Sequence, residues 1–141
     1  MVPPKPVVAA LTAIAGLIPS WPIVPSPNIV DKAFRDKSYA ELVRASPYFV
    51  DYEPRVATAI SMLEATNFVS TNMEKISLPY LLLHGAADNV TDPNMSKEFF
   101  ERSQSDDKTF KLYPDVYHSI YEDPDGEHAW SDTLEWLETR I

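Results

Sequence analysis

The feature that most constrains this sequence is a short apolar run closed abruptly by a turn. The run, Leu81–Leu83, lies within Ser77–Pro93 and ends at His84-Gly85, and an acidic turn centred on Asp88 follows. A short apolar run bounded by glycine and turn-forming residues is typical of a strand buried in a parallel sheet. Because the chemistry of an open α/β sheet lies just beyond the carboxyl ends of its strands, Asp88 is a candidate functional residue.

A second segment ends in the same way. Lys108–Tyr113 alternates, with Phe110 and Leu112 on one face, which predicts a strand, and the loop after it contains His118. An acid and a histidine at the ends of consecutive strands are two of the three side chains of a hydrolase triad. Spacing alone is also compatible with an Asx-turn at Asp88 and a loop histidine with satisfied hydrogen bonds at position 118.

The residues between and after these strands predict helices. Asp92 and Pro93 stand in the order of an N-cap and a first helical residue, and the helix is expected to continue to about Arg102. The two strands and this helix form one βαβ unit, for which a right-handed crossover is expected. A closing helix carries one apolar stripe made up of Trp130, Leu134, Leu137 and Ile141.

The first half of the sequence shows helical or extended patterns and no convincing strand. The apolar block Val7–Ile18 is ended by Pro19 and is well short of the roughly 20 residues needed to span a bilayer. It predicts an apolar helix, with a secretory signal as the weaker alternative. Asn28–Ser46 has helical spacing as well. These patterns are those of a lid or cap, and not of a sheet domain.

Two further helices are expected before the first strand. Pro54 is placed as the first residue of a helix whose apolar positions are Val56, Ile60 and Leu63. Thr71 and Glu74 have the spacing of a capping box, which predicts one more short helix.

The charge and composition exclude several classes of function. A formal net charge of −9 argues against a nucleic-acid partner, because no basic stripe is available to displace counterions from phosphates. The same charge opposes simple electrostatic docking on an anionic membrane. The absence of cysteine removes disulfides, thiolate metal sites and a cysteine nucleophile. We expect no cofactor and no metal, and a cytoplasmic location with peripheral membrane contact as an option.

The sequence resembles a known family over nearly its whole length. The stretches LLLHGAADNVTDP and DDKTFKLYPDVYHSIYEDPDGE, followed by a closing W-x-x-x-R helix, are similar to the C-terminal half of monoacylglycerol lipase-like serine hydrolases. Plant caffeoylshikimate esterases belong to the same α/β-hydrolase superfamily, in the group called the serine aminopeptidase type. The upstream stretches IVPSPNIVDKAFRD and EPRVATAISMLEAT resemble the cap of that family.

This resemblance implies a fold and a set of roles. Residues 1–76 would form the helical cap, and residues 77–141 the C-terminal part of an incomplete α/β-hydrolase core with the last βαβ unit and the C-terminal helix. Asp88 would be the triad acid and His118 the triad base. The substrate would be a monoacylglycerol-like acyl ester or another lipid, with its acyl chain bound by cap residues Leu11, Ile14, Leu17 and Ile18.

The nucleophile of that family has no counterpart here. Its serine lies in a G-x-S-x-G elbow, and the glycines of this chain, Gly16, Gly85 and Gly126, cannot form that pattern. The chain is therefore expected to be the C-terminal portion of such a hydrolase and inactive alone. A truncated gene model, a genuine short product and a half that assembles with a separate N-terminal half all remain open.

Two physical consequences accompany this expectation. A parallel pair of strands with an open apolar edge is marginally stable and invites self-association or pairing with another chain.

A non-catalytic lipid- or partner-binding module derived from such a hydrolase is the alternative function. Its binding would be insensitive to substitution of Asp88 and His118.

Other polar residues near the strand ends have more ordinary interpretations. His84 is expected to pack or hydrogen-bond and not to react, and Asp92 is expected to cap a helix. A metal site made from His84, Asp88, Asp92 and His118 is conceivable by ligand type, but the spacing matches no known metal motif. Ser119 is a poor substitute nucleophile, because adjacent loop residues rarely align for attack.

Overall fold

The structure is a computed structural model that describes residues 5–25, 28–50 and 53–141, apart from the side chains of Lys5 and Leu11. The chain forms two compact units, each assembled from two separate stretches. One contains Met1–Pro27 and Val50–Asn72, and the other contains Asn28–Phe49 and Met73–Ile141. Residues 28–49 therefore share a unit with the strands, while the division at residue 76 stays a prediction.

The first unit is built around two helices. As predicted, the apolar block near the N-terminus is helical, but its helix, α1 (Lys5–Ala15), ends at Ala15 and not at Pro19. It packs against α4 (Val56–Thr71). Leu17, just after α1, is 84% exposed. None of the helices in the described ranges is long and apolar enough to cross a membrane.

The beginning of α4 is set by hydrogen bonds from the preceding chain. The predicted start at Pro54 is wrong, because the helix begins at Val56 and has no side-chain cap. The backbone N–H groups of Val56 and Ala57 donate to the carbonyls of Trp21 and Pro19, at 3.1 and 3.0 Å. These carbonyls satisfy two of the amides that a first helical turn leaves without partners.

The capping box predicted after α4 is also wrong. Thr71 is the last residue of α4, and its hydroxyl donates to the carbonyl of Asn67 at 2.8 Å. The residues that follow form only a short 3₁₀ helix, η1 (Met73–Lys75). A local side-chain bond to the preceding turn has replaced the cap.

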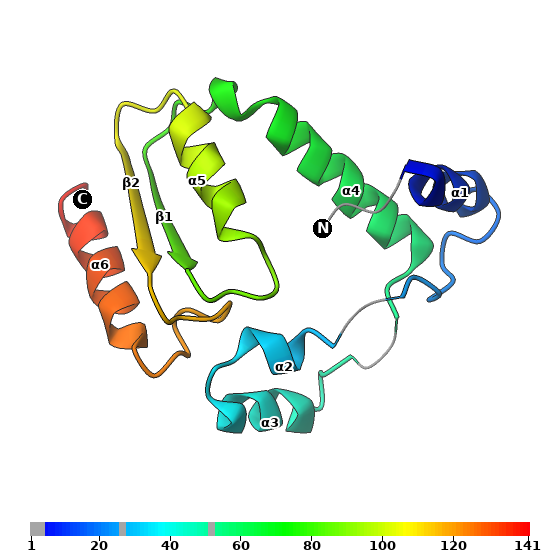
Figure 1. Cartoon of the computed structure of the whole chain (residues 1–141), viewed down its shortest axis with the longest axis horizontal. Coiled ribbons are helices and arrows are strands. Elements are labelled where there is room, and N and C mark those ends of the chain that lie inside the picture. Colours follow the sequence, from blue (N-terminus) through cyan, green and yellow to red (C-terminus); the bar gives the residue numbers. More distant parts are fainter. Residues whose placement is uncertain (1–4, 26–27, 51–52) are drawn as a thin grey trace. The chain divides into compact units, whose positions relative to one another are not determined.

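The second unit contains a parallel two-stranded sheet. β1 (Tyr80–Gly85) pairs with β2 (Lys108–Tyr113), and the register runs from Tyr80 opposite Lys108 to Gly85 opposite Tyr113. Both strands lie where the sequence predicts them, although β1 continues through His84 and Gly85. Figure 1 shows them as neighbouring green and yellow arrows, with α5 and α6 to either side.

One face of the sheet is covered by α5 (Pro93–Arg102). The helix begins as predicted, because the Asp92 side chain accepts a hydrogen bond from the Asn94 backbone N–H at 2.9 Å and Pro93 occupies the first turn. Phe100 packs on Phe110 of β2, with ring centroids 5.7 Å apart.

The other face of the sheet is covered by α6 (Gly126–Glu138). The Tyr113 hydroxyl donates to Asp132 of this helix at 2.7 Å, and burial, reinforced by that carboxylate, raises the pKa of Tyr113. The predicted apolar stripe lies on the outer side of α6, where Trp130, Leu134 and Leu137 are exposed.

The segment between the two parts of the first unit forms two short helices and not one. α2 (Val30–Ala33) ends at Phe34, whose backbone is extended, and α3 (Lys37–Ala45) starts after the Asp36 cap. The single helix predicted over Asn28–Ser46 is therefore interrupted, and the interruption contains Arg35.

Candidate active site

The end of β1 places Asp88 beside the end of β2. The N–H of Ala86 donates to the carbonyl of Tyr113 at 2.8 Å, so the sheet pairing continues one residue beyond the strands. The chain then turns, and the N–H of Asp88 donates to the carbonyl of Gly85 at 3.2 Å. This turn holds the Asp88 side chain at the carboxyl edge of the sheet, where only 2% of that side chain is exposed.

The two carboxylate oxygens of Asp88 have different partners. Oδ1 accepts the backbone N–H groups of Val90 and Thr91, at 2.7 and 3.0 Å, and so closes an Asx-turn. Oδ2 is 2.9 Å from Nδ1 of His118. The turn interpretation and the triad interpretation of Asp88 are therefore compatible, because each uses a different oxygen.

Gly85 allows the His118 loop to approach β1. A Cβ at position 85 would lie 2.2 Å from the carbonyl oxygen of Val116 and 2.4 Å from that of Tyr117. The N–H of Ala87 also donates to the Val116 carbonyl, at 3.1 Å. The backbone of the loop is thus fixed two residues before His118.

The imidazole of His118 is held at one nitrogen only. Its Nδ1 faces Asp88, and no other described residue forms a hydrogen bond or ion pair with its Nε2. The side chain is 39% exposed. An ionised carboxylate can only accept, so Nδ1 of His118 carries the proton that it donates, and in the neutral imidazole Nε2 is the unprotonated nitrogen that faces outward. This is the state of a general base.

Three side chains around Asp88 had no assigned role in the site. Thr91 Oγ1 donates to Oδ2 of Asp88 at 2.5 Å. His84 Nε2 lies 3.2 Å from the same oxygen, and its Nδ1 is 2.7 Å from the hydroxyl of Ser96. As predicted, His84 is buried and hydrogen-bonded. The only sequence signal for this cluster is that a histidine, an acid and a threonine follow one another at the end of β1.

Hydrogen bonding dominates the electrostatics of Asp88. Burial alone raises the pKa of a carboxyl group, but here the donors outweigh it. The hydroxyl of Thr91, the imidazole of His118 and the backbone N–H groups of Val90 and Thr91 lower the pKa of Asp88 to about 2. Asp88 is consequently ionised at neutral pH and able to stabilise a positive charge on His118.

A metal centre has no support here. The part of the chain that the structure describes contains no group of three or more histidine, aspartate or glutamate side chains placed to hold a metal ion. The carboxylate of Asp92 is used as a helix cap.

The cap residues predicted to bind an acyl chain lie in the first unit. Ile14 and Ile18 are half-buried, Leu17 is exposed, and the side chain of Leu11 lies outside the described residues. Their assignment to substrate binding stays a prediction.

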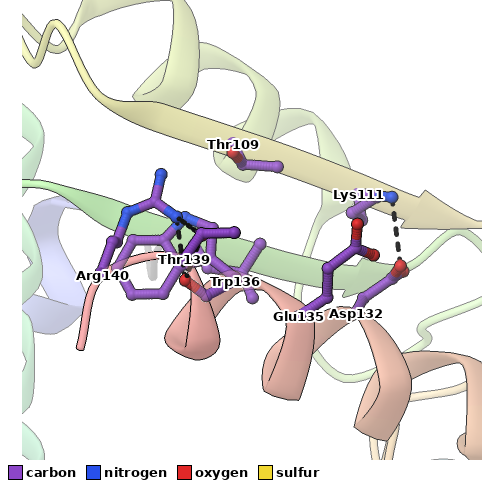
Figure 2. A pocket seen from close by; sticks show the side chains of 8 residues that line it. Thr109, Lys111, Asp132, Glu135, Trp136, Thr139 and Arg140 are labelled. Atoms are coloured by element: carbon purple, nitrogen blue, oxygen red, sulfur yellow. Dashed lines mark hydrogen bonds and ion pairs between the residues drawn. The ribbon is translucent and has the colours of Figure 1, made fainter.

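A cavity of about 240 Å³ lies between α6 and the sheet (Figure 2). Its lining includes Leu81, Thr109 and Trp136, and it contains neither Asp88 nor His118. Three of its charged side chains have described partners: Lys111 lies 3.1 Å from Asp132, and Arg140 pairs with Asp107 and stacks on Trp136. The carboxyl edge of the sheet, where Asp88 and His118 meet, is therefore the candidate site.

Comparison with known proteins gives consistent matches. Residues 1–125 match the family model described as serine aminopeptidase, S33. A caffeoylshikimate esterase from Arabidopsis thaliana is 33% identical over 144 residues, covering 100% of this chain and 43% of that protein. A monoglyceride lipase from Rattus norvegicus is 34% identical over 89 residues, covering 63% of this chain and 29% of the lipase.

Solved structures match over nearly the whole chain. The monoacylglycerol lipase of Paleococcus ferrophilus superposes with a TM-score of 0.87 at 26% identity, covering 99% of this chain and 54% of the lipase. A soluble variant of the monoglyceride lipase of Saccharomyces cerevisiae gives a TM-score of 0.81 at 23% identity, which shows the shared fold alone. The chain thus spans about half of these structures, and less of the curated relatives above.

Proposed function

Because this chain belongs to the serine aminopeptidase, S33 family and forms part of an α/β-hydrolase fold, we propose that it supplies the acid and the base of a serine ester hydrolase. Asp88 is the acid, His118 is the base, and the attacking serine lies outside these 141 residues. The observation that supports the proposal is the 2.9 Å contact between Asp88 Oδ2 and His118 Nδ1, which leaves Nε2 open.

The proposed mechanism gives each residue a step. The serine oxygen attacks the ester carbonyl while its proton moves to Nε2 of His118, giving a tetrahedral intermediate and an imidazolium. Asp88 stays ionised and stabilises the imidazolium through Nδ1–H. His118 then gives its proton to the leaving alcohol, and an acyl-enzyme remains. Water, deprotonated by His118, attacks this acyl group and releases the carboxylic acid and the serine.

The proposed substrate is a monoacylglycerol-like acyl ester. The relatives include lipases named for monoacylglycerols and an esterase named for caffeoylshikimate, and all of these substrates are carboxylic esters of an alcohol. The apolar residues of α1 and the loop after it, such as Ile14 and Ile18, are proposed to contact the acyl chain and to touch lipid surfaces.

The proposed partner of this chain is the part of the hydrolase that it does not contain. Within the described residues the sheet has two strands, so each strand has a hydrogen-bonded neighbour on one side only. Further strands, whether from a longer polypeptide, a separate N-terminal half or a second copy, would satisfy the outer backbone groups. The isolated chain is expected to have no ester hydrolase activity, since it has no G-x-S-x-G serine.

A hybrid enzyme tests this proposal. In it, this chain replaces the matching 54% of the Paleococcus ferrophilus lipase, and hydrolysis of a monoacylglycerol is measured. We expect activity in the hybrid, and a loss on the order of 10⁴-fold in kcat/KM for Asp88→Asn and for His118→Ala. His128→Ala is the matched control, because His128 is an exposed histidine on α6.

Two results would contradict the proposal. One is a hybrid whose hydrolysis survives His118→Ala. The other is hydrolysis by the isolated chain that His118→Ala abolishes, because it would place the nucleophile within these residues. Binding of lipid vesicles that is unaffected by both substitutions would favour the non-catalytic module.

A further inference from the structure

Both neighbours of His118 are attached to a segment that is distant in the sequence. The N–H of Ser119 donates to the carbonyl of Ala33 at 2.9 Å. On the other side, the N–H of Tyr117 donates to Oδ2 of Asp123 in a long hydrogen bond of 3.5 Å. The opposite oxygen of that carboxylate, Oδ1, accepts from the Arg35 guanidinium at 2.6 Å. Ala33 at the end of α2 and Arg35 in the break that follows are therefore connected to the backbone on either side of the histidine, Arg35 through Asp123.

We propose that Arg35 is a positioning residue for His118: its guanidinium acts through Asp123 on the Tyr117 side, and it anchors the segment whose Ala33 carbonyl holds Ser119 on the other side. The inference rests on the proposed function only in giving His118 the role of base.

The break between α2 and α3 makes this contact possible. Ala33 is the last residue of α2, so its carbonyl is one of those that a helix end leaves without an intrahelical partner. Phe34 is extended and Asp36 caps α3. Arg35 is thus held between two fixed residues, and its side chain reaches the loop before α6.

The Asp123 carboxylate requires a cation in this place. Its side chain is 0% exposed, and a buried carboxylate is costly unless it is paired and hydrogen-bonded. Arg35 supplies the charge, and it also bonds to Asp125. The N–H of Asp125 closes the loop by donating to Oδ1 of Asp123 at 3.0 Å. Removing Arg35 would leave Asp123 buried without a counter-charge.

This arrangement adds a constraint that Asp88 cannot supply. Asp88 at 2.9 Å and the Thr91 hydroxyl at 3.4 Å both lie at Nδ1 of the imidazole, and contacts at one nitrogen leave the ring free to move with its loop. A displacement of about 1 Å in a catalytic group can cost on the order of 100-fold in rate. Gly85 allows the loop to pack on β1, and the Ala33–Arg35 segment fixes it from a second direction.

Hydrogen exchange tests the proposal on the chain as it is. The unsubstituted chain, called the parent below, and the Arg35→Met variant are compared by NMR. The measurement is the exchange rate of the Tyr117 and Ser119 amide protons and of the His118 Nδ1 proton. We expect these three protons to exchange on the order of tenfold faster in Arg35→Met, as for loss of one hydrogen-bonded anchor of a loop. Strand amides, such as that of Phe110, are expected to change little. Arg35→Lys keeps the charge and should restore most of the protection.

The matched control is Arg44→Met. Arg44 pairs with Asp31 on the same segment and forms no described bond to the His118 loop. Equal exchange at Ser119 and His118 in Arg35→Met and Arg44→Met would overturn the proposal, as would a uniform acceleration of all amides. If Arg35→Met fails to fold, the double variant Arg35→Met/Asp123→Leu is used, because it removes the unpaired charge as well. Amide protection in that double variant equal to that of the parent would also overturn the proposal. None of these readouts depends on ester hydrolysis, so they can fail separately from the proposed function.

Discussion

His84 and His118 approach the same oxygen of Asp88, with Nε2 of His84 3.2 Å and Nδ1 of His118 2.9 Å from Oδ2. His118 donates to this carboxylate, which can only accept. The hydrogen bond of His84 Nε2 is to Thr91 Oγ1 at 3.4 Å, and because that hydroxyl gives its own proton to Asp88, it accepts from Nε2–H of His84. The unprotonated Nδ1 of neutral His84 then receives the hydroxyl proton of Ser96. One series of hydrogen bonds therefore runs from Ser96 of α5 through the buried imidazole of His84 and the Thr91 hydroxyl to Asp88.

This series of hydrogen bonds predicts which nitrogen of His84 carries the proton. In the parent, ¹⁵N NMR should show His84 protonated at Nε2, and Ser96→Ala should let the other tautomer appear and lower the free energy of unfolding by about 1 kcal/mol. Ser119→Ala is the control, because its hydroxyl has no described bond to His84. A parent spectrum with His84 protonated at Nδ1 alone would contradict the prediction.

Asp88 should make stability depend on acid pH. Its pKa falls from its ordinary value of 3.8 to about 2 in the fold, so the folded state binds this proton less readily than the unfolded state. The resulting stability is complete above pH 4 and is lost as pH falls toward 2, with a difference of about 2 kcal/mol. Urea unfolding from pH 2 to 6 should show this component in the parent and not in Asp88→Asn. Identical pH slopes in the two proteins would refute it.

Gly85→Ala should damage the site through the backbone. The added methyl group meets two carbonyl oxygens of the His118 loop, which cannot move without breaking the Ala87 hydrogen bond. We expect a loss of about 1–3 kcal/mol in urea unfolding and a shifted His118 resonance. At Gly16 a Cβ meets nothing within 4 Å, so Gly16→Ala should leave both unchanged. Equal effects of the two substitutions would contradict this explanation.

The exposed stripe of α6 should promote self-association. Sedimentation of the parent is expected to show a mass that rises with concentration, and Leu134→Lys should reduce that rise. The lysine lowers the negative charge of the chain, which by itself favours association, so a reduction would come from the lost apolar contact. Glu127→Gln makes the same change in charge on α6 and should not reduce association. A monomeric parent at all concentrations would disprove the prediction.

The sequence predicted those elements whose signals are local. Asp92 and Pro93 mark the start of α5 because a cap and a fixed φ act within one turn. Asp88 and His118 were expected to meet because consecutive parallel strands bring their carboxyl ends to one edge.

Long-range contacts account for most of what the sequence did not predict. In the break between α2 and α3, Arg35 pairs with Asp123, which is 88 residues away in the sequence. The helical spacing of residues 28–46 contains no information about that partner. The start of α4 depends on carbonyls before residue 22, and the shared contact of His84 depends on how β1 turns. The outer stripe of α6 was visible as a pattern, but periodicity does not say which side meets the sheet.

The interleaved order of the two units has a consequence for synthesis. Asn28–Phe49 and Met73–Ile141 share one unit, yet Val50–Asn72 separates them and belongs to the other. On a ribosome, Arg35 is made long before Asp123, and the loop between them must close before the ion pair forms. Such non-local closure slows folding. The support of His118 should therefore assemble late, only after Asp123 has been made and has met Arg35.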